Sequence, residues 1–317
     1  MALPLLAMFP GQGSQFVGMG KDALGEFPRA RLTFEEAEDA IGVKLRDLCL
    51  EGPADELELT SNQQPAILTL SLAIWRILQD EAGLTSQYFA GHSLGEYSAL
   101  IAAGKLAFAD GVRLVRQRGL AMQRAVPREV GAMAAVLGMD GDKLAALCRK
   151  YSQAAELCVE VVNFNSPEQQ IISGHRQGVE GVCAALGEQG IKTVKLAVSA
   201  PFHSSLMAPA REAMRPLLLQ SLIATNDAYL IANVSGEIIR NYGAELLIQQ
   251  IDQPVLWSKS LTASHAAGLT TYLEVGPGRV LFGLARKCLP AGVTLMHSND
   301  LKTAINKITS VFAAPSS

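Results

Sequence analysis

Residues 91–95 read G-H-S-L-G, and this match to the pattern G-x-S-x-G constrains the fold more than any other segment of the chain. A strand is expected near Tyr88 and a helix rich in small residues over 97–103. Between a strand and a helix, the two glycines permit a crowded turn that exposes the serine hydroxyl above the sheet. The sequence therefore predicts an α/β fold with Ser93 as a candidate nucleophile, beside which the Leu94 N–H can stabilise an oxyanion.

The size and composition of the chain are those of a globular protein with a large core. It has 317 residues, of which 49% are hydrophobic and 18% charged, and this length predicts two domains or one large domain with an insert. The net charge of −3 gives no basis for nucleic-acid binding. The longest apolar stretch, 65–78, is too short to span a membrane. The N-terminus lacks a basic segment and a long apolar run, so we interpret it as a first strand and not as a signal peptide.

The cysteines favour a reduced, cytoplasmic protein. Their number is odd, and they show neither C-x-x-C spacing nor a neighbouring histidine cluster, which argues against a disulfide framework or a zinc site. The five positions are Cys49, Cys148, Cys158, Cys183 and Cys288.

The middle of the chain has a different pattern from its two ends. Residues 129–198 predict the order β-α-β-β-α-β, which is that of a ferredoxin-like unit. The flanking segments, 1–128 and 199–317, predict alternating strands and helices and are expected to form one larger α/β domain. Strands are expected at 5–9, near 88, and at 132–138, 159–163, 170–173, 191–198, 229–234 and 271–275. Helices are expected at 35–41, 65–78, 97–103, 110–126, 142–151, 178–186, 209–220 and 244–251.

A serine hydroxyl needs a base to act as a nucleophile at neutral pH. Among the histidines, His203 is favoured because its loop follows the last strand of the insert and precedes a helix, at a seam between domains where clefts form. The others are expected to be structural or solvated, with the first of them pointing away from Ser93. They are His92, His175, His265 and His297.

Residues 11–15, G-Q-G-S-Q, follow the first expected strand and allow two interpretations. They match half of a dinucleotide fingerprint, but Phe16 occupies the position of the third glycine. The alternative is a tight loop over the serine, in which the Gln12 backbone is a second oxyanion donor.

Arg118 lies on the wrong face of its expected helix for a solvated cation. It falls within about 60° of the stripe formed by Val115, Met122 and Val126. A buried guanidinium either forms an ion pair with an internal Asp or Glu or binds a carboxylate ligand in bidentate fashion. From the residues alone both interpretations stay open.

Five segments together resemble the malonyl-CoA:acyl-carrier-protein transacylase family, and the match extends over nearly the whole chain. They are F-P-G-Q-G-S-Q at 9–15, G-H-S-L-G-E at 91–96, Q-R-G at 117–119, N-F-N-S-P at 163–167 and E-V-G-P-G at 274–278. The resemblance implies a hydrolase-like α/β core with a mostly parallel sheet and a ferredoxin-like insert. It also implies transfer of a malonyl group from malonyl-CoA, through a serine ester, to the phosphopantetheine thiol of acyl carrier protein in fatty acid biosynthesis.

The resemblance assigns roles to five positions. Ser93 becomes the nucleophile, His203 the base and Arg118 the carboxylate-binding residue, while the backbones of Gln12 and Leu94 form the oxyanion hole. Malonyl-CoA carries a free carboxylate beyond its thioester, so it supplies the ligand that the buried arginine needs.

Three more positions follow from the same resemblance. The family orients its histidine with a backbone carbonyl near a P-V-x-W segment, which predicts the carbonyl of Leu256. Asn165 is a candidate pocket residue, with a turn-forming role as the alternative. Phe202 resembles the motif version that accompanies malonyl selectivity, and exclusion of an α-methyl group by packing is worth about 1 to 3 kcal/mol.

The resemblance also implies partners. The substrates are malonyl-CoA and phosphopantetheinylated acyl carrier protein, and we expect no bound cofactor or metal, no nucleic-acid or membrane partner, and a monomer. Carrier proteins are usually acidic, so Arg279, Arg286 and Lys287 are candidate docking residues, with solvated surface positions as the alternative.

Two rival functions are compatible with the same residues. A thioesterase or carboxylesterase would use the serine turn with water as acceptor, and would release free malonate instead of transferring it. A noncatalytic carrier-protein docking subunit would keep the fold but would not acquire a malonyl group.

Overall fold

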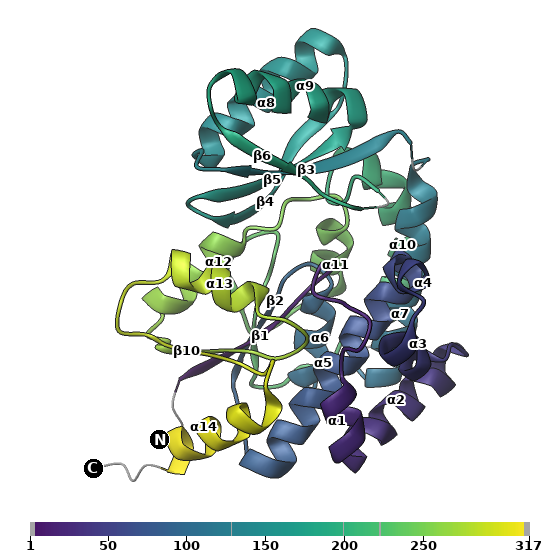
Figure 1. The fold of residues 1–317 in the computed structure, drawn as a ribbon, viewed down its shortest axis with the longest axis vertical. Coiled ribbons are helices and arrows are strands. Elements are labelled where there is room, and N and C mark those ends of the chain that lie inside the picture. The colour runs from purple at the N-terminus through teal and green to yellow at the C-terminus, as the bar shows by residue number, and fades with distance from the viewer. Residues whose placement is uncertain (1–3, 128, 199, 222, 314–317) are drawn as a thin grey trace.

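The computed structural model describes residues 4–127, 129–198, 200–221 and 223–313. Within them, a six-stranded sheet and a four-stranded sheet lie one above the other (Figure 1). All neighbouring strands of the larger sheet are parallel except the last pair. Its strands lie in the order β10 (Thr294–His297), β9 (Thr271–Glu274), β1 (Leu5–Phe9), β2 (Tyr88–Gly91), β7 (Tyr229–Ile231) and β8 (Ile238–Ile239).

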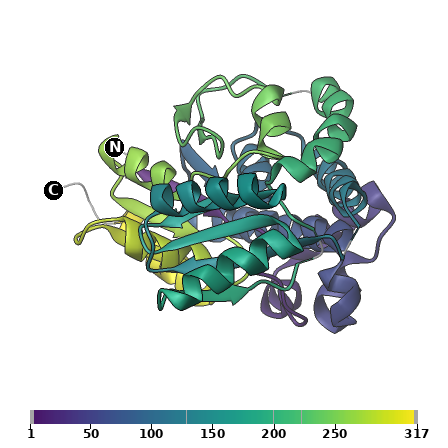
Figure 2. The same cartoon turned by 90° about the horizontal axis from the view of Figure 1, so that it is seen from above.

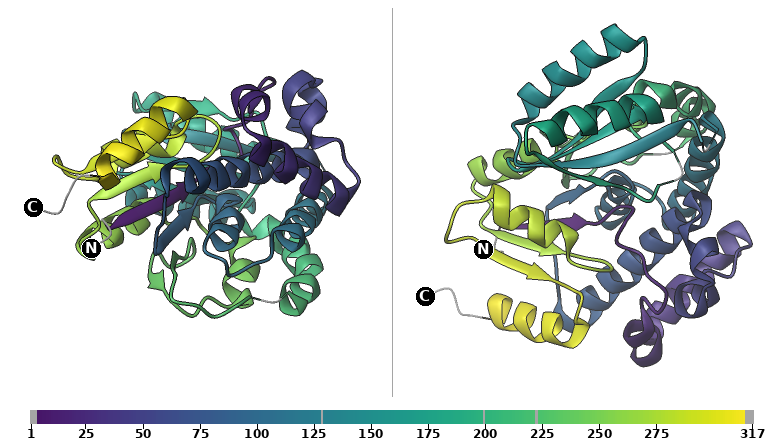
Figure 3. Two further views of the ribbon diagram at one scale, coloured as in Figure 1. Left: turned by 90° about the horizontal axis from the view of Figure 1, so that it is seen from below. Right: turned by 45° about the horizontal axis from the view of Figure 1, so that its top comes forward.

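Helices cover both faces of the larger sheet, which is why β1 is apolar at every position. Leu5 and Phe9 belong to the largest hydrophobic cluster, and the Phe9 ring meets that of Trp75 at 6.1 Å between centroids. Figure 3 (left) shows the long helix that carries Trp75 crossing beside this strand. Leu6 and Met8 face a second cluster. The helices are α1 (Lys21–Glu26), α2 (Pro28–Ile41), α3 (Leu45–Glu51), α4 (Ala54–Glu58), α5 (Thr60–Ala82), α6 (Gly95–Ala102), α7 (Phe108–Ala125), η1 (Ser205–Met207), α10 (Ala208–Gln220), α11 (Ala244–Gln250), α12 (Trp257–Ala266), α13 (Val280–Cys288) and α14 (Leu301–Ala313).

The smaller sheet is antiparallel throughout, in the order β4 (Val159–Ser166), β5 (Gln169–His175), β3 (Gly131–Leu137) and β6 (Lys192–Lys195). Helices α8 (Gly141–Ala155) and α9 (Arg176–Glu188) lie side by side on its outer face (Figure 2). Alternate residues of β3 therefore enter different cores. Ala134 and Val136 pack under these helices, whereas Met133 and Ala135 join the core of the larger part.

Backbone hydrogen bonds at Val255 join the two parts. Val255, in the loop before α12, donates to Val162 O at 2.8 Å and accepts from Phe164 N at 2.9 Å. It thereby makes a parallel bridge to Asn163 in the middle of β4. This bridge fixes the smaller sheet against the segment that leads from α11 to α12.

The mixed α/β class and the mostly parallel sheet are confirmed, and most expected elements are present with ends shifted by a few residues. The expected strand at 191–198 is shorter, because β6 pairs with β3 over 192–195 only. The sequence reasoning missed the short elements α1, α3, α4, η1, β8 and β10 and the last two helices, α13 and α14. Strand β10 has four residues, too few for a periodic signal, and it forms by parallel pairing with β9.

Helix α5 begins five residues before the expected start at Pro65. A proline has no N–H, so the carbonyl of Ser61, one turn earlier, loses its helical donor. Arg116 of α7 replaces that donor, with its Nη1 at 2.7 Å from Ser61 O. The helix can therefore continue through the proline because a side chain from another helix satisfies the backbone.

The glycines of the G-x-S-x-G turn are required by close backbone contacts. A Cβ at Gly95 would lie 2.0 Å from Phe9 O, inside the end of β1. We expect Gly95→Ala to cost about 3 kcal/mol of unfolding free energy or more. In the control Gly187→Ala, nothing lies within 4 Å of the added atom, and stability should rise by about 0.4 to 1 kcal/mol. Urea unfolding measures both, and similar midpoints for the two variants would contradict the packing argument.

Candidate active site

The turn between β2 and α6 holds Ser93 in a left-handed backbone conformation, with φ of 51°. A non-glycine residue seldom adopts this conformation, and it persists only where the surroundings enforce it. Asn233 supplies that support: its Oδ1 accepts from Ser93 N at 2.7 Å and its Nδ2 donates to Gly91 O at 2.7 Å. The side chain of Asn233 thus braces both sides of the turn.

The structure brings Ser93 and His203 together. The Nε2 atom of His203 lies 2.7 Å from Ser93 Oγ, although 110 positions separate the two residues. The Nδ1 atom lies 2.8 Å from the carbonyl oxygen of Gln250. A carbonyl only accepts hydrogen bonds, so Nδ1 carries the hydrogen and Nε2 is left to accept the serine proton. This is the tautomer that a general base for Ser93 requires.

The prediction that Leu256 provides the carbonyl was wrong. Its oxygen accepts from the backbone N and the Oγ of Ser260, at 2.9 and 3.0 Å, and so forms the first turn of α12. Gln250 is the last residue of α11. The last carbonyls of a helix have no partner within the helix, which leaves the Gln250 oxygen available to the imidazole.

The imidazole of His203 should stay neutral at mildly acidic pH. Burial, and then the nearby Arg118 cation, lower the pKa of His203 from 6.5 to about 3. We therefore expect its NMR resonances to show no titration between pH 8 and pH 5, and a midpoint near 6.5 would contradict this prediction. The unfolded chain binds the same proton near pH 6.5, so the contribution of His203 to stability must fall as the pH drops from 6.5 towards 3.

Arg118 is completely buried and its guanidinium contacts neutral groups. Nη1 donates to Gln64 Oε1 at 3.0 Å, and Nη2 donates to Ser93 Oγ at 3.1 Å and to Gln250 Oε1 at 2.9 Å. Among the residues that the structure describes, no carboxylate forms an ion pair with it, so the internal ion pair considered from the sequence is not found there. Its carbon Cζ also lies 5.6 Å from the centre of the Tyr97 ring. A buried cation held by neutral groups retains charge for an anionic ligand.

The loop at 11–15 packs directly against the serine turn. A Cβ at Gly11 would lie 2.5 Å from His92 O. Within the described residues, the backbone N–H groups of Gln12 and Leu94 donate to no other group. The next helix, α1, begins only at Lys21, so the loop does not open a helix as a dinucleotide fingerprint does.

Asn165 and Phe202 are both buried beside the site. Asn165 Oδ1 lies 2.8 Å from His92 Nε2, and its Nδ2 donates to Gln169 Oε1 at 3.3 Å. His92 therefore points away from Ser93. The remaining histidines bond elsewhere: His175 Nδ1 accepts from Cys158 N, His265 Nδ1 lies near Leu269 O, and the His297 ring packs on Phe282.

Sequence reasoning missed Gln250, Asn233 and Gln64, which hold the base, the serine turn and the arginine. Each is a single amide residue outside any recognised motif, and each acts on a residue more than forty positions away. Gln250 lay at the end of an expected helix, but nothing in the pattern distinguished it. Only the contacts reveal these residues.

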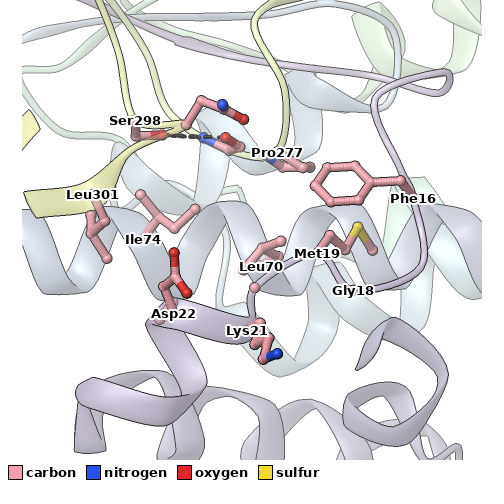
Figure 4. Close-up of a pocket in the computed structure, with 14 residues that line it drawn as sticks. Phe16, Gly18, Met19, Lys21, Asp22, Leu70, Ile74, Pro277, Ser298 and Leu301 are labelled. Atoms are coloured by element: carbon pink, nitrogen blue, oxygen red, sulfur yellow. Dashed lines mark hydrogen bonds between the residues drawn. The ribbon is translucent and has the colours of Figure 1, made fainter. Parts of the chain in front are cut away.

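Two cavities in the described part of the chain do not include Ser93 in their lining. One of about 320 Å³ reaches His203 between the smaller sheet and residues 252–254. Another, of about 300 Å³, lies beside Phe16, Met19 and Pro277 (Figure 4) and shares no lining residue with the serine–histidine pair. Over the described ranges, no cluster of His, Cys, Asp and Glu side chains could hold a metal ion. None of the helices in that part of the chain combines the length and apolarity of a membrane span.

The candidate docking residues differ in their surroundings. Arg279 and Arg286 are exposed at α13. Lys287 lies 3.5 Å from the carboxylate of Glu168, across an exposed ion pair.

Comparison with known proteins gives a consistent result. The model of the family described as "Acyl transferase domain" matches residues 8–297. The malonyl CoA-acyl carrier protein transacylase of Bacillus subtilis (strain 168) is 46% identical over 283 residues, which cover 88% of this chain and 89% of that protein. The enzyme of the same name from Escherichia coli (strain K12) is 43% identical, with 88% and 91% covered.

Solved structures agree over nearly the whole chain. The crystal structure of FabD from Acinetobacter baumannii superposes with a TM-score of 0.93 at 40% identity, covering 98% of this chain and 100% of that one. A malonyl-transacylase solved in complex with a type II PKS acyl-carrier protein gives a TM-score of 0.89 at 38% identity, with 96% and 99% covered.

Proposed function

This chain belongs to the acyl transferase family, and we propose that it transfers a malonyl group from malonyl-CoA to acyl carrier protein for fatty acid biosynthesis. One observation carries the proposal: Ser93 Oγ lies 2.7 Å from His203 Nε2 and 3.1 Å from Arg118 Nη2. A nucleophile between a base and a buried cation suits an acyl group that ends in a carboxylate. A simple esterase would have no use for that cation.

In the first half-reaction, His203 Nε2 takes the hydroxyl proton as Ser93 Oγ attacks the thioester carbonyl. The carbonyl of Gln250 holds the imidazole through Nδ1–H and stabilises the imidazolium that forms. The free N–H groups of Gln12 and Leu94 stabilise the oxyanion. The C–S bond then breaks, the CoA thiolate takes the proton from the imidazolium, and a malonyl-serine ester remains.

In the second half-reaction, the phosphopantetheine thiol of the carrier protein gives its proton to His203 and attacks the ester. Collapse of the second oxyanion breaks the C–O bond, and Ser93 recovers its proton. Arg118 binds the malonyl carboxylate in both steps, which keeps the acyl group in one orientation while donor and acceptor exchange.

We further infer that residues 129–198 form a ferredoxin-like small domain within a hydrolase-like large domain at 1–128 and 199–317. The element order β-α-β-β-α-β and the strand order β4-β5-β3-β6 support the small unit. The boundary positions 128 and 199 themselves lie outside the described residues. The free cysteines support a reducing, cytoplasmic setting, and the monomeric state stays a prediction.

Intact-protein mass spectrometry tests the function directly. The purified chain should gain one malonyl group on incubation with malonyl-CoA and lose it on addition of phosphopantetheinylated acyl carrier protein, which gains it. Release of free malonate at the rate of loading would favour a hydrolase. A chain that acquires no acyl mass would contradict the proposal.

A further inference from the structure

Glu96 is a buried carboxylate that the mechanism above does not use. It lies one turn after Ser93 in α6 and is only 1% exposed. Three donors point at it: Asn233 N at 2.9 Å and Tyr242 Oη at 2.8 Å meet Oε1, and Gln250 Nε2 meets Oε2 at 2.7 Å. An ionised carboxylate is an acceptor only, so this set of donors matches the anion.

The contacts of Gln250 require one orientation of its side-chain amide. Its Nε2 donates to Glu96 Oε2 and to Ser93 O, both at 2.7 Å, while its Oε1 accepts from Arg118 Nη2 at 2.9 Å. If the amide were reversed, its NH₂ would face the guanidinium and its oxygen would face two acceptors. Glu96, which accepts from the NH₂ of Gln250, and Arg118, which donates to its oxygen, therefore favour the same orientation of this side-chain amide.

The amide also separates two opposite charges. Because Gln250 lies between them, Glu96 compensates the Arg118 charge without covering its hydrogen-bonding edge, as a direct ion pair would. The attraction acts in both directions, since Arg118 favours the ionised form of Glu96 and Glu96 favours that of Arg118. The arginine thus keeps an edge beside Ser93 for a ligand.

We propose that Glu96 is a positioning residue that fixes the Gln250 amide, and through it Arg118, so that the site prefers acyl groups ending in a carboxylate. This inference rests on the proposed malonyl transfer. In Glu96→Gln, an NH₂ group replaces one of the two carboxylate oxygens. It then lies either opposite the Gln250 NH₂ or opposite the Asn233 N–H. The first arrangement drives Gln250 to reverse and present its own NH₂ to Arg118. The second leaves a buried backbone donor opposed by another donor.

The test compares loading of the enzyme by malonyl-CoA and by acetyl-CoA, each followed by intact mass. Burial raises the pKa of Glu96 to about 7, so the assays are run at pH 8, where its anion dominates. In Glu96→Gln the ratio of malonyl to acetyl loading should fall at least tenfold, with acetyl loading changed less than threefold. The matched control is Tyr242→Phe, which removes the other side-chain donor to Glu96 but none of the contacts of Gln250, and should keep the ratio within threefold.

The outcomes separate the two proposals. Failure of the unaltered chain to load malonyl would reject the function itself. Normal loading by that chain, with an unchanged ratio in Glu96→Gln, would overturn the role of Glu96. An equal loss for both acyl groups would also overturn it, because a merely structural residue lowers both. If Glu96→Gln does not fold, Glu96→Asp decides: its shorter carboxylate withdraws from Gln250 Nε2, so the ratio must still fall, and an unchanged ratio rejects the proposal.

Discussion

Ser93→Ala should form no malonyl-enzyme and should lower malonyl transfer by roughly 10⁴- to 10⁶-fold, the range seen when a serine nucleophile is removed from its base and oxyanion hole. Alanine keeps the Cβ and therefore fits the turn as serine does. The loss of transfer activity then results from the missing nucleophile and not from a changed turn. Loading with malonyl-CoA followed by intact mass measures the adduct, and a carrier-protein assay measures transfer.

Helix α6, which follows the serine turn, provides a matched control for this variant. Ser98 is fully buried in α6, and its Oγ has no hydrogen-bond partner among the described residues. Ser98→Ala should therefore load malonyl at the normal rate. A malonyl adduct on Ser93→Ala at a near-normal rate would show that another residue is the nucleophile.

Arg118→Ala should reverse the acyl preference. Removing one partner of a buried, hydrogen-bonded charge pair costs about 2 to 5 kcal/mol, so malonyl loading should fall by roughly 30- to 5,000-fold. Acetyl-CoA has no terminal carboxylate, and its loading should hold or rise. The rates of both half-reactions, measured with malonyl-CoA and acetyl-CoA side by side, give the comparison.

Arg113→Ala is the control for Arg118→Ala, because Arg113 lies on the exposed face of the same helix and pairs with Asp110 there. Its acyl preference should not change. Equal losses for the two substrates in Arg118→Ala would mean that the arginine supports the serine turn and does not bind the acyl carboxylate.

Local chemistry made part of the site predictable. The turn at 91–95 follows from a short pattern with a single structural solution, and Arg118 could be placed inside by helical spacing alone. His203 was found because it lies where the insert rejoins the larger part of the chain. Each of these inferences needed only neighbouring residues.

The rest depends on contacts between distant segments. Gln250, Asn233 and Glu96 are ordinary residues until folding places them around the serine, and the bonds that join them span 132 to 157 positions. The error at Leu256 has the same origin. Pro254, in the segment predicted to orient the histidine, lines a cavity together with His203. The carbonyl that faces the ring is set by the geometry at the end of α11.

The bridge between Val255 and β4 has a mechanical consequence. The six residues from Gln250 to Val255 tie the histidine at one end to the smaller sheet at the other, and Leu256 N then donates to Asn233 O at 2.8 Å, behind the serine turn. A rotation of the smaller sheet relative to the larger one would displace both Ser93 and His203. We therefore expect the two sheets to keep their relative position while acyl donor and acceptor bind, so that any rearrangement is confined to loops and side chains.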